Sequence, residues 1–209
     1  MGNDSLKKPR TGLNTLGFCS FLFSILVAAS IDNQSAILSL SALAFLQAVL
    51  IVMVILICFK SPQPELIPWQ LGLLITNFLT LLTSMSLGLL VSTFVKNISQ
   101  ANSALPLLLL PQIIFSGVLF KIENAVSVVS WLMLSRWSVG AYGTLVNLNG
   151  LVPEPMQLAN GSIVPQPFEV TSVYEPTWSN LGLNWGMLCL HTVVYLTVAF
   201  SLQKRKDIF

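Results

Sequence analysis

Charged residues are scarce in this sequence. Lys and Arg number 10 and Asp and Glu number 8 among 209 residues, or 9% of the chain, whereas 54% of the residues are hydrophobic. The mean hydropathy is +0.78. A water-soluble domain carries roughly 25% charged residues. Most of the surface must therefore face lipid, and the sequence predicts an all-α membrane protein that crosses a bilayer several times.

Cysteine and catalytic motifs are scarce as well. Cys19, Cys58 and Cys189 lie far apart, each alone in an apolar run, which argues against a disulfide framework or a zinc site. The chain has no GxxxxGK[ST] phosphate loop and no HExxH or GxSxG motif. We therefore expect no catalytic residue, metal or cofactor in this chain. The net charge of +2 is too small to indicate a nucleic-acid partner.

Long apolar segments predict a bundle of four to five transmembrane helices, since about 20 apolar residues span a bilayer. The four strongest segments cover residues 36–59, 69–95, 101–120 and 181–202. Pro106 and Pro111 lie inside the third segment. Each proline frees a backbone carbonyl that needs another partner, so this helix is expected to be kinked and to pack against protein on one side.

A shorter apolar segment covers residues 12–30 and is followed by Asp32 and two polar residues. It is consistent with an interfacial helix, a signal-like segment or the remnant of a further helix. The sequence therefore divides into a basic N-terminal region, residues 1–35, and a transmembrane domain, residues 36–209.

Basic residues predict the orientation, because Lys and Arg near span ends stay in the cytoplasm. The chain ends on a basic run at residues 204–206, and Lys7, Lys8 and Arg10 precede the first apolar segment. Both termini are therefore expected to be cytoplasmic in a cell membrane, which requires an even number of crossings and favours four. Residues 121–180 are then extracytoplasmic. Their apolar part, 126–146, is too polar for a full crossing and is expected to dip into the outer leaflet or to lie along it.

Several stretches resemble one family. Residues 102–120 contain a Phe115-Ser116-Gly117 core followed by small apolar residues, and residues 87–92 read Leu-Gly-Leu-Leu-Val-Ser. From residue 36 onward the chain resembles the membrane domain of type-2 ABC exporters, in particular the ABCG (white/pigment) branch. The two stretches are similar to the end of the fifth helix of that family and to its fourth helix.

The remaining resemblance lies nearer the C-terminus. Trp131, Arg136-Trp137 and Ala141-Tyr142 resemble the re-entrant segment that follows the fifth helix, and the last apolar segment with its basic tail is similar to the sixth helix. The first helix pair and the connecting and coupling helices of the family are not recognisable in residues 1–35. The ATPase domain, which in this branch is usually fused ahead of the membrane domain, is not recognisable either, so the resemblance implies a gene truncated on the N-terminal side, a fragment, or a half that assembles with separate subunits.

The resemblance implies the transmembrane half of an ATP-driven exporter. Its expected partners are a separate ABC ATPase domain, which would bind the ATP, and a second transmembrane half in the lipid bilayer, most simply as a homodimer. The alternative is a truncated, non-transporting membrane protein or scaffold. An ion-coupled transporter is disfavoured, because no predicted span contains an acidic residue.

Polar and aromatic residues within apolar segments are the candidates for a substrate pathway. Asn77 and Gln112 either line a cavity or bond to neighbouring helices. By the resemblance, Val118 and Leu119 match an apolar plug that closes the cavity toward the outside, with Phe115 just below it, although packing alone would also account for them. Arg136, between Trp131 and Trp137, is either a functional charge of the re-entrant segment or an arginine that reaches the interface while the indoles anchor it.

Overall fold

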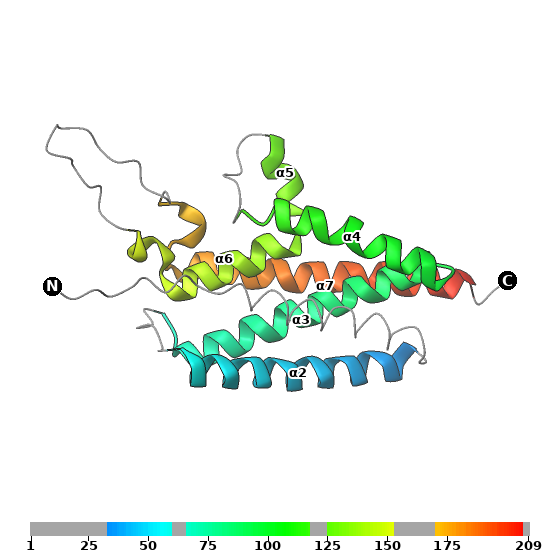
Figure 1. The fold of residues 1–209 in the computed structure, drawn as a ribbon, viewed down its shortest axis with the longest axis horizontal. Coiled ribbons are helices and arrows are strands. Elements are labelled where there is room, and N and C mark those ends of the chain that lie inside the picture. Colours follow the sequence, from blue (N-terminus) through cyan, green and yellow to red (C-terminus); the bar gives the residue numbers. More distant parts are fainter. Residues whose placement is uncertain (1–32, 60–65, 118–124, 153–169, 207–209) are drawn as a thin grey trace, which may run out of the picture.

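The computed structural model describes residues 33–59, 66–117, 125–152 and 170–206, and within these ranges every regular element is a helix. The longer elements pack along or across one another in the bundle shown in Figure 1, and the shorter ones connect them. The elements are α2 (Asn33–Cys58), α3 (Trp69–Phe94), α4 (Ile98–Ile114), α5 (Ala125–Trp131), α6 (Leu134–Val146), η1 (Leu148–Leu151), η2 (Ser172–Tyr174) and α7 (Trp178–Lys206). The predicted all-α membrane bundle is confirmed.

Three of the described helices, α2, α3 and α7, are long and apolar enough to cross a membrane. Helix α3 begins at Trp69, as the sequence predicts, and α2 and α7 each extend beyond the predicted segments at their N-terminal ends. Helix α2 is apolar around most of its circumference, and Leu46, Leu50 and Ile57 are among its many exposed side chains. Such a helix suits a position with lipid on its outer side.

Helix α4 is shorter than the predicted segment 101–120. Its 17 residues span about 25 Å at 1.5 Å per residue, against a hydrocarbon core of about 30 Å. The helix begins after Asn97, whose side chain accepts a hydrogen bond from the Gln100 amide. It ends at Ile114, because Phe115 leaves the helical conformation and Gly117 has a φ of 84°. Residues 118–120 lie outside the described ranges.

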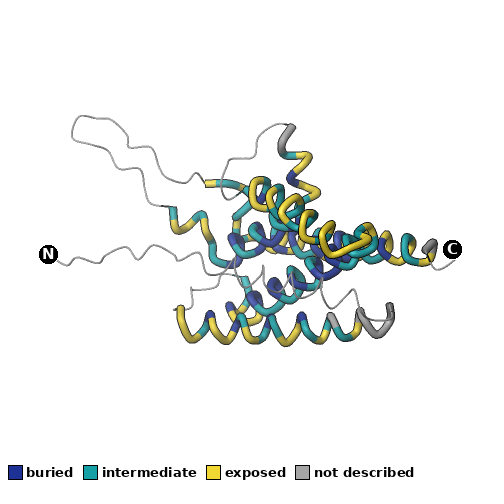
Figure 2. Tube along the Cα trace, turned by 45° about the vertical axis from the view of Figure 1, so that its right-hand side comes forward, coloured by how far each residue is buried: buried dark blue, intermediate teal, exposed yellow. Residues whose placement is uncertain are grey.

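The core lies where α3, α6 and α7 meet. Helices α3 and α7 run through the middle of the bundle, with α2 on one side and α4 on the other (Figure 1). Buried positions concentrate on α3 and α6, whereas α2 and α4 show long exposed stretches (Figure 2). Ala44 and Ala48 of α2 are fully buried against Leu81 and Met85 of α3. These small residues, one turn apart, allow the two helices to approach closely.

The predicted segment 126–146 forms two helices, α5 and α6, separated at Leu132 and Met133. Helix α6 lies within the bundle and not along its surface, since more than half of its residues are buried and it packs against both α3 and α7. Close packing depends on its glycines. A Cβ atom on Gly143 would lie 2.2 Å from the ring of Tyr174, and one on Gly140 would lie 2.5 Å from Oδ1 of Asn184.

The two ends of the bundle differ in what they carry. The turn at residues 95–97, between α3 and α4, lies at the same end as the C-terminal end of α7, whereas η1 and η2 lie at the opposite end (Figure 1). Lys96 and Lys204 therefore belong to one end, which the predicted topology assigns to the cytoplasm. The side of the membrane on which each end lies stays a prediction.

Candidate functional site

Polar side chains of α3 make hydrogen bonds to α6 and α7 inside the bundle. The pairs are Thr76 with Trp185 at 3.0 Å, Asn77 with Tyr142 at 2.8 Å, Thr80 with Ser138 at 2.9 Å and Thr83 with Thr192 at 2.9 Å. In a lipid-embedded bundle such bonds hold helices together, because lipid tails provide no alternative partner for a hydroxyl or an amide. Helices α3, α6 and α7 therefore form one hydrogen-bonded unit.

Asn77 is buried within this unit and uses both ends of its amide. Its Nδ2 donates to the Leu73 carbonyl at 2.9 Å, and its Oδ1 accepts from the Tyr142 hydroxyl. Asn77 thus makes a hydrogen bond between helices α3 and α6, and its place in a substrate pathway stays a prediction. Sequence reasoning missed Tyr142 as its partner. The helical spacing of the polar residues in α3 predicts that they share one face of the helix, but it does not predict which helix packs against that face.

Gln112 joins the end of α4 to the beginning of α6. Its Oε1 accepts a hydrogen bond from the Ser135 backbone N–H at 3.0 Å, and the Ser135 hydroxyl donates to the Gln112 backbone carbonyl. The first amides and the last carbonyls of a helix lack partners within that helix. Each of the two residues thus caps the helix of the other, and Gln112 acts here as a link between helices.

The predicted gate is described only in part. Phe115 lies directly after α4 as its C-terminal cap residue, and its backbone N–H donates to the Pro111 carbonyl at 2.9 Å. The next residue, Ser116, is buried. Val118 and Leu119 lie outside the described residues. The apolar plug therefore stays a prediction.

Trp131, Arg136 and Trp137 come together as the sequence suggested. The Arg136 Cζ atom lies 5.9 Å from the ring centroid of Trp131 and 5.5 Å from that of Trp137, within reach of cation–π attraction. The two indoles meet edge to face with centroids 5.2 Å apart, and Trp137 Nε1 donates to the Trp131 carbonyl at 3.0 Å. The Arg136 guanidinium also donates to the Ser130 hydroxyl. We call these four residues the Arg136 cluster.

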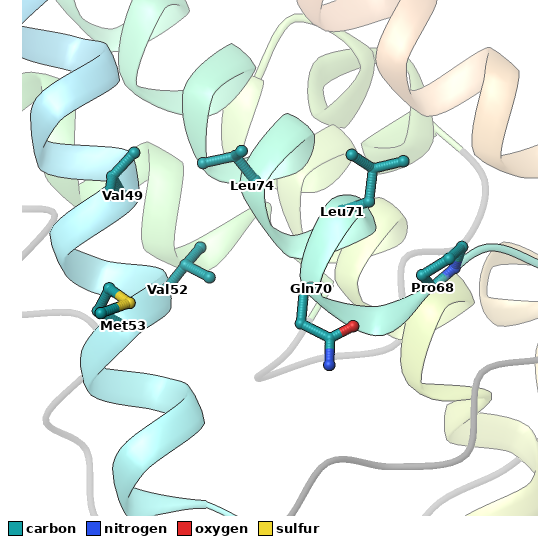
Figure 3. Close-up of a pocket in the computed structure, with 7 residues that line it drawn as sticks. All are labelled: Val49, Val52, Met53, Pro68, Gln70, Leu71 and Leu74. Atoms are coloured by element: carbon teal, nitrogen blue, oxygen red, sulfur yellow. The ribbon is translucent and has the colours of Figure 1, made fainter.

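A shallow, open groove of about 300 Å³ lies between α2 and α3, at the surface of the bundle (Figure 3). Its lining is apolar except for one amide, and comprises Val49, Val52, Met53, Pro68, Gln70, Leu71 and Leu74. None of the residues predicted from the sequence lies in it. Exposed apolar side chains such as Met53 and Leu71 line the groove, so lipid tails are its natural neighbours in a membrane.

Comparison with known families decides the broad class. Residues 33–147 match the family model described as ABC-2 type transporter. The chain belongs to the ABC-2 transporter membrane family. The match begins at the first residue of α2 and ends directly after α6, so it includes the Asn77–Tyr142 and Gln112–Ser135 pairs and the Arg136 cluster. No curated protein and no solved structure matched the chain.

Membership identifies this ABC-2 chain as a transmembrane component of an ABC transporter. In such systems the membrane component is the permease, and ATP hydrolysis belongs to a separate domain. The sequence of this ABC-2 chain has no phosphate loop, in keeping with that division. The family match extends to ABC-2 transporters in general and leaves the ABCG-like subtype and the truncation as predictions.

Proposed function

We propose that this ABC-2 chain is the membrane half of an ATP-driven exporter. It forms a substrate pathway with a second membrane domain, most simply another copy of itself, and separate ATPase domains on the cytoplasmic side bind and hydrolyse ATP. Closure of the ATPase pair would rock the two helix bundles and open the pathway to the outside. Apolar walls with few polar groups favour amphipathic or lipid-like cargo.

The exposure of α4 is the observation that carries this proposal. None of its 17 residues is buried, and Leu107, Leu110 and Ile113 are exposed. Lipid alone is an unsuitable neighbour, because Pro106 and Pro111 lack the N–H groups that would otherwise bond the carbonyls four residues earlier. Freed carbonyls in hydrocarbon need protein or water as partners. A second membrane half, with a water-containing pathway between the halves, supplies both.

The position of α4 supports the same proposal. The helix lies on the opposite side of the bundle from α2 (Figure 1), so a partner on α4 leaves the lipid-facing side of α2 free. Gln112 and Phe115 are near the outer end of α4 under the predicted orientation. We place the pathway along α4, with Phe115, Val118 and Leu119 as its outer gate.

Cross-linking of α4 tests the arrangement. In a chain whose three native cysteines are replaced by serine, Leu110→Cys should form a disulfide-linked dimer in membranes under mild oxidation. Leu50→Cys on α2 is the matched control, because Leu50 and Leu110 are 56% and 57% exposed. Equal cross-linking at both positions, or cross-linking at Leu50 alone, would remove α4 from the interface.

A second experiment separates the exporter from the alternative of a non-transporting scaffold. The purified chain alone should show no saturable ATP hydrolysis. When the chain is purified from native membranes in mild detergent, an ATPase subunit should co-purify with it. After reconstitution of that complex into proteoliposomes, added ATP should drive transport of a fluorescent short-chain phospholipid. A complex that hydrolyses ATP without moving any of a panel of amphipathic dyes and lipids would favour the scaffold.

A further inference from the structure

Arg136 lies about half-way along the helices that cross the membrane. The next residue, Trp137, packs with Leu87 of α3 in one buried apolar cluster. The Ser138 hydroxyl bonds to that of Thr80, which is close to the middle of α3. Because α3 is long enough to cross a bilayer, Arg136 is near the depth of the bilayer centre. Charged side chains are costly at this depth, and those that occur there line a cavity or meet a partner group.

No carboxylate among the described residues balances the charge of Arg136. Glu175 is the one acidic residue within the described ranges, and it is exposed directly after η2, at one end of the bundle. The hydrogen bond described for the guanidinium goes to the Ser130 hydroxyl, a neutral acceptor, whereas a guanidinium has five N–H donors. The indoles of Trp131 and Trp137 lie 5.9 and 5.5 Å from the guanidinium carbon. The described neighbours therefore hold a cation in place and bring no negative charge to it.

Arg136 points to the side of the bundle on which we place the substrate pathway. Helices α4 and α5 both lie on that side, opposite α2 (Figure 1). The guanidinium reaches α5 through Ser130, and the preceding residue, Ser135, is bonded to Gln112 near the end of α4. Arg136 itself is half-buried. The cation is thus beside the mid-membrane end of α4.

We propose that Arg136 binds the anionic group of the exported molecule, so that the substrates of this ABC-2 chain are amphipathic anions. The planar guanidinium suits a carboxylate, because it can donate two parallel hydrogen bonds to the two oxygens. Leu110 and Ile113, exposed on α4 and three residues apart, would contact the apolar body of the same molecule. This inference rests on the proposed function, because it assumes that the pathway follows α4.

Two probes of nearly equal size test the proposal. The chain, purified from native membranes in a mild nonionic detergent, is titrated with a fluorescent amphipathic carboxylate and with its uncharged primary amide, and binding is followed by fluorescence anisotropy. The carboxylate should bind about tenfold more tightly or better, the effect expected of a charge-assisted hydrogen bond. Arg136→Gln should remove this preference and leave amide binding within about twofold, whereas Arg136→Lys should retain part of it. Lys204→Gln, a cation at one end of the bundle, should leave the preference unchanged.

Equal binding of the two probes by the unmodified chain would overturn the proposal, even if Arg136→Gln failed to fold. So would a preference that persists in Arg136→Gln or is lost equally in Lys204→Gln. Acetate is titrated as a competitor. If acetate at the concentration of the probe displaced the carboxylate completely, the site would bind small anions and not an amphipath.

The same preparation separates this inference from the proposed function. Binding is measured without ATP, and transport of both probes is then measured in proteoliposomes with ATP. Preference for the carboxylate without ATP-driven transport would count against the exporter and support the anion site. ATP-driven transport of both probes with equal affinity would support the exporter and overturn the anion site.

Discussion

Gln112 and Ser135 cap each other's helices across the junction of α4 and α6. The amide oxygen of Gln112 satisfies a first-turn N–H of α6, and the hydroxyl of Ser135 satisfies a last-turn carbonyl of α4. The contact joins the most exposed helix of the bundle to the hydrogen-bonded unit of α3, α6 and α7. In the proposed exporter, we expect this link to limit how far α4 can move on its own.

Removing this link should loosen α4 and destabilise the fold. Gln112→Ala and Ser135→Ala should each cost about 1 kcal/mol, as loss of a helix cap does. The double variant should cost less than the sum of the two, because the residues share one contact. Thermal unfolding in detergent measures the effects, with Gln70→Ala, an exposed amide on α3, as the control. Additive losses would mean that the two residues act independently.

The bond between Asn77 and Tyr142 should contribute to stability more than to transport. Tyr142→Phe leaves the Asn77 Oδ1 without its described partner and should cost about 0.6–2 kcal/mol. Asn77→Leu combined with Tyr142→Phe should recover part of that loss, because no polar group is then left unpaired. Tyr195→Phe is the control, since the contacts described for Tyr195 are packing contacts, with the His191 ring and with the apolar cluster around Leu188. Loss of transport at unchanged stability would instead place Asn77 in the pathway.

Gly143 should tolerate no side chain. A Cβ there would lie 2.2 Å from one Tyr174 ring carbon and 2.8 Å from another, so Gly143→Ala should destabilise the fold by about 1–3 kcal/mol through overpacking. Gly186→Ala on α7 is the matched control, because a Cβ there meets nothing within 4 Å, and alanine favours helices over glycine by about 1 kcal/mol. Thermal unfolding should therefore show opposite signs. Tyr174→Ala in the Gly143→Ala background should restore stability, and a failure to do so would assign the clash elsewhere.

The gate prediction concerns activity and not stability. Phe115→Asp and Leu119→Asp place a charge at the proposed outer gate and should reduce transport and substrate-stimulated ATP hydrolysis in the assembled exporter. Membrane insertion and dimer formation should persist, because Phe115 follows α4 and is not fully buried. Asp at Leu46, exposed on α2, controls for the added charge. Normal activity in both gate variants would assign these positions to packing.

The long apolar segments predict the long helices, but not the end of α4 at Ile114 or the break between α5 and α6. Helix α3 begins where Trp69 follows Pro68, a local signal that is visible in the sequence. The break at Leu132 and Met133 has no glycine or proline to announce it. It coincides with contacts to other helices, such as the Gln112–Ser135 link, so tertiary structure and not local preference accounts for it.

The candidate site shows the same limit. The sequence itself brings Trp131, Arg136 and Trp137 together, because they lie within six residues of one another along the chain. The partners of Asn77 and Gln112 lie 65 and 23 residues away. A single sequence shows which side chains need a hydrogen-bond partner inside a membrane, but it does not show which distant residue supplies one.

Topology is the prediction that rests most directly on the basic residues. Lys96 and the basic tail belong to the same end of the bundle, and the positive-inside rule assigns that end to the cytoplasm. Single cysteines at Asn97, Lys204 and Ser162, in a chain without its native cysteines, are labelled in intact cells with an impermeant reagent. Only Ser162→Cys should react in intact cells, and all three cysteines should react after the membrane is permeabilised.

A cysteine at Ser5 distinguishes four membrane crossings from five. With four crossings the N-terminus is cytoplasmic and this cysteine is protected from the reagent, whereas with five crossings it lies outside and is labelled. Reaction at Asn97→Cys and Lys204→Cys with protection at Ser162→Cys would invert the orientation, and with it the assignment of Phe115, Val118 and Leu119 to an outer gate.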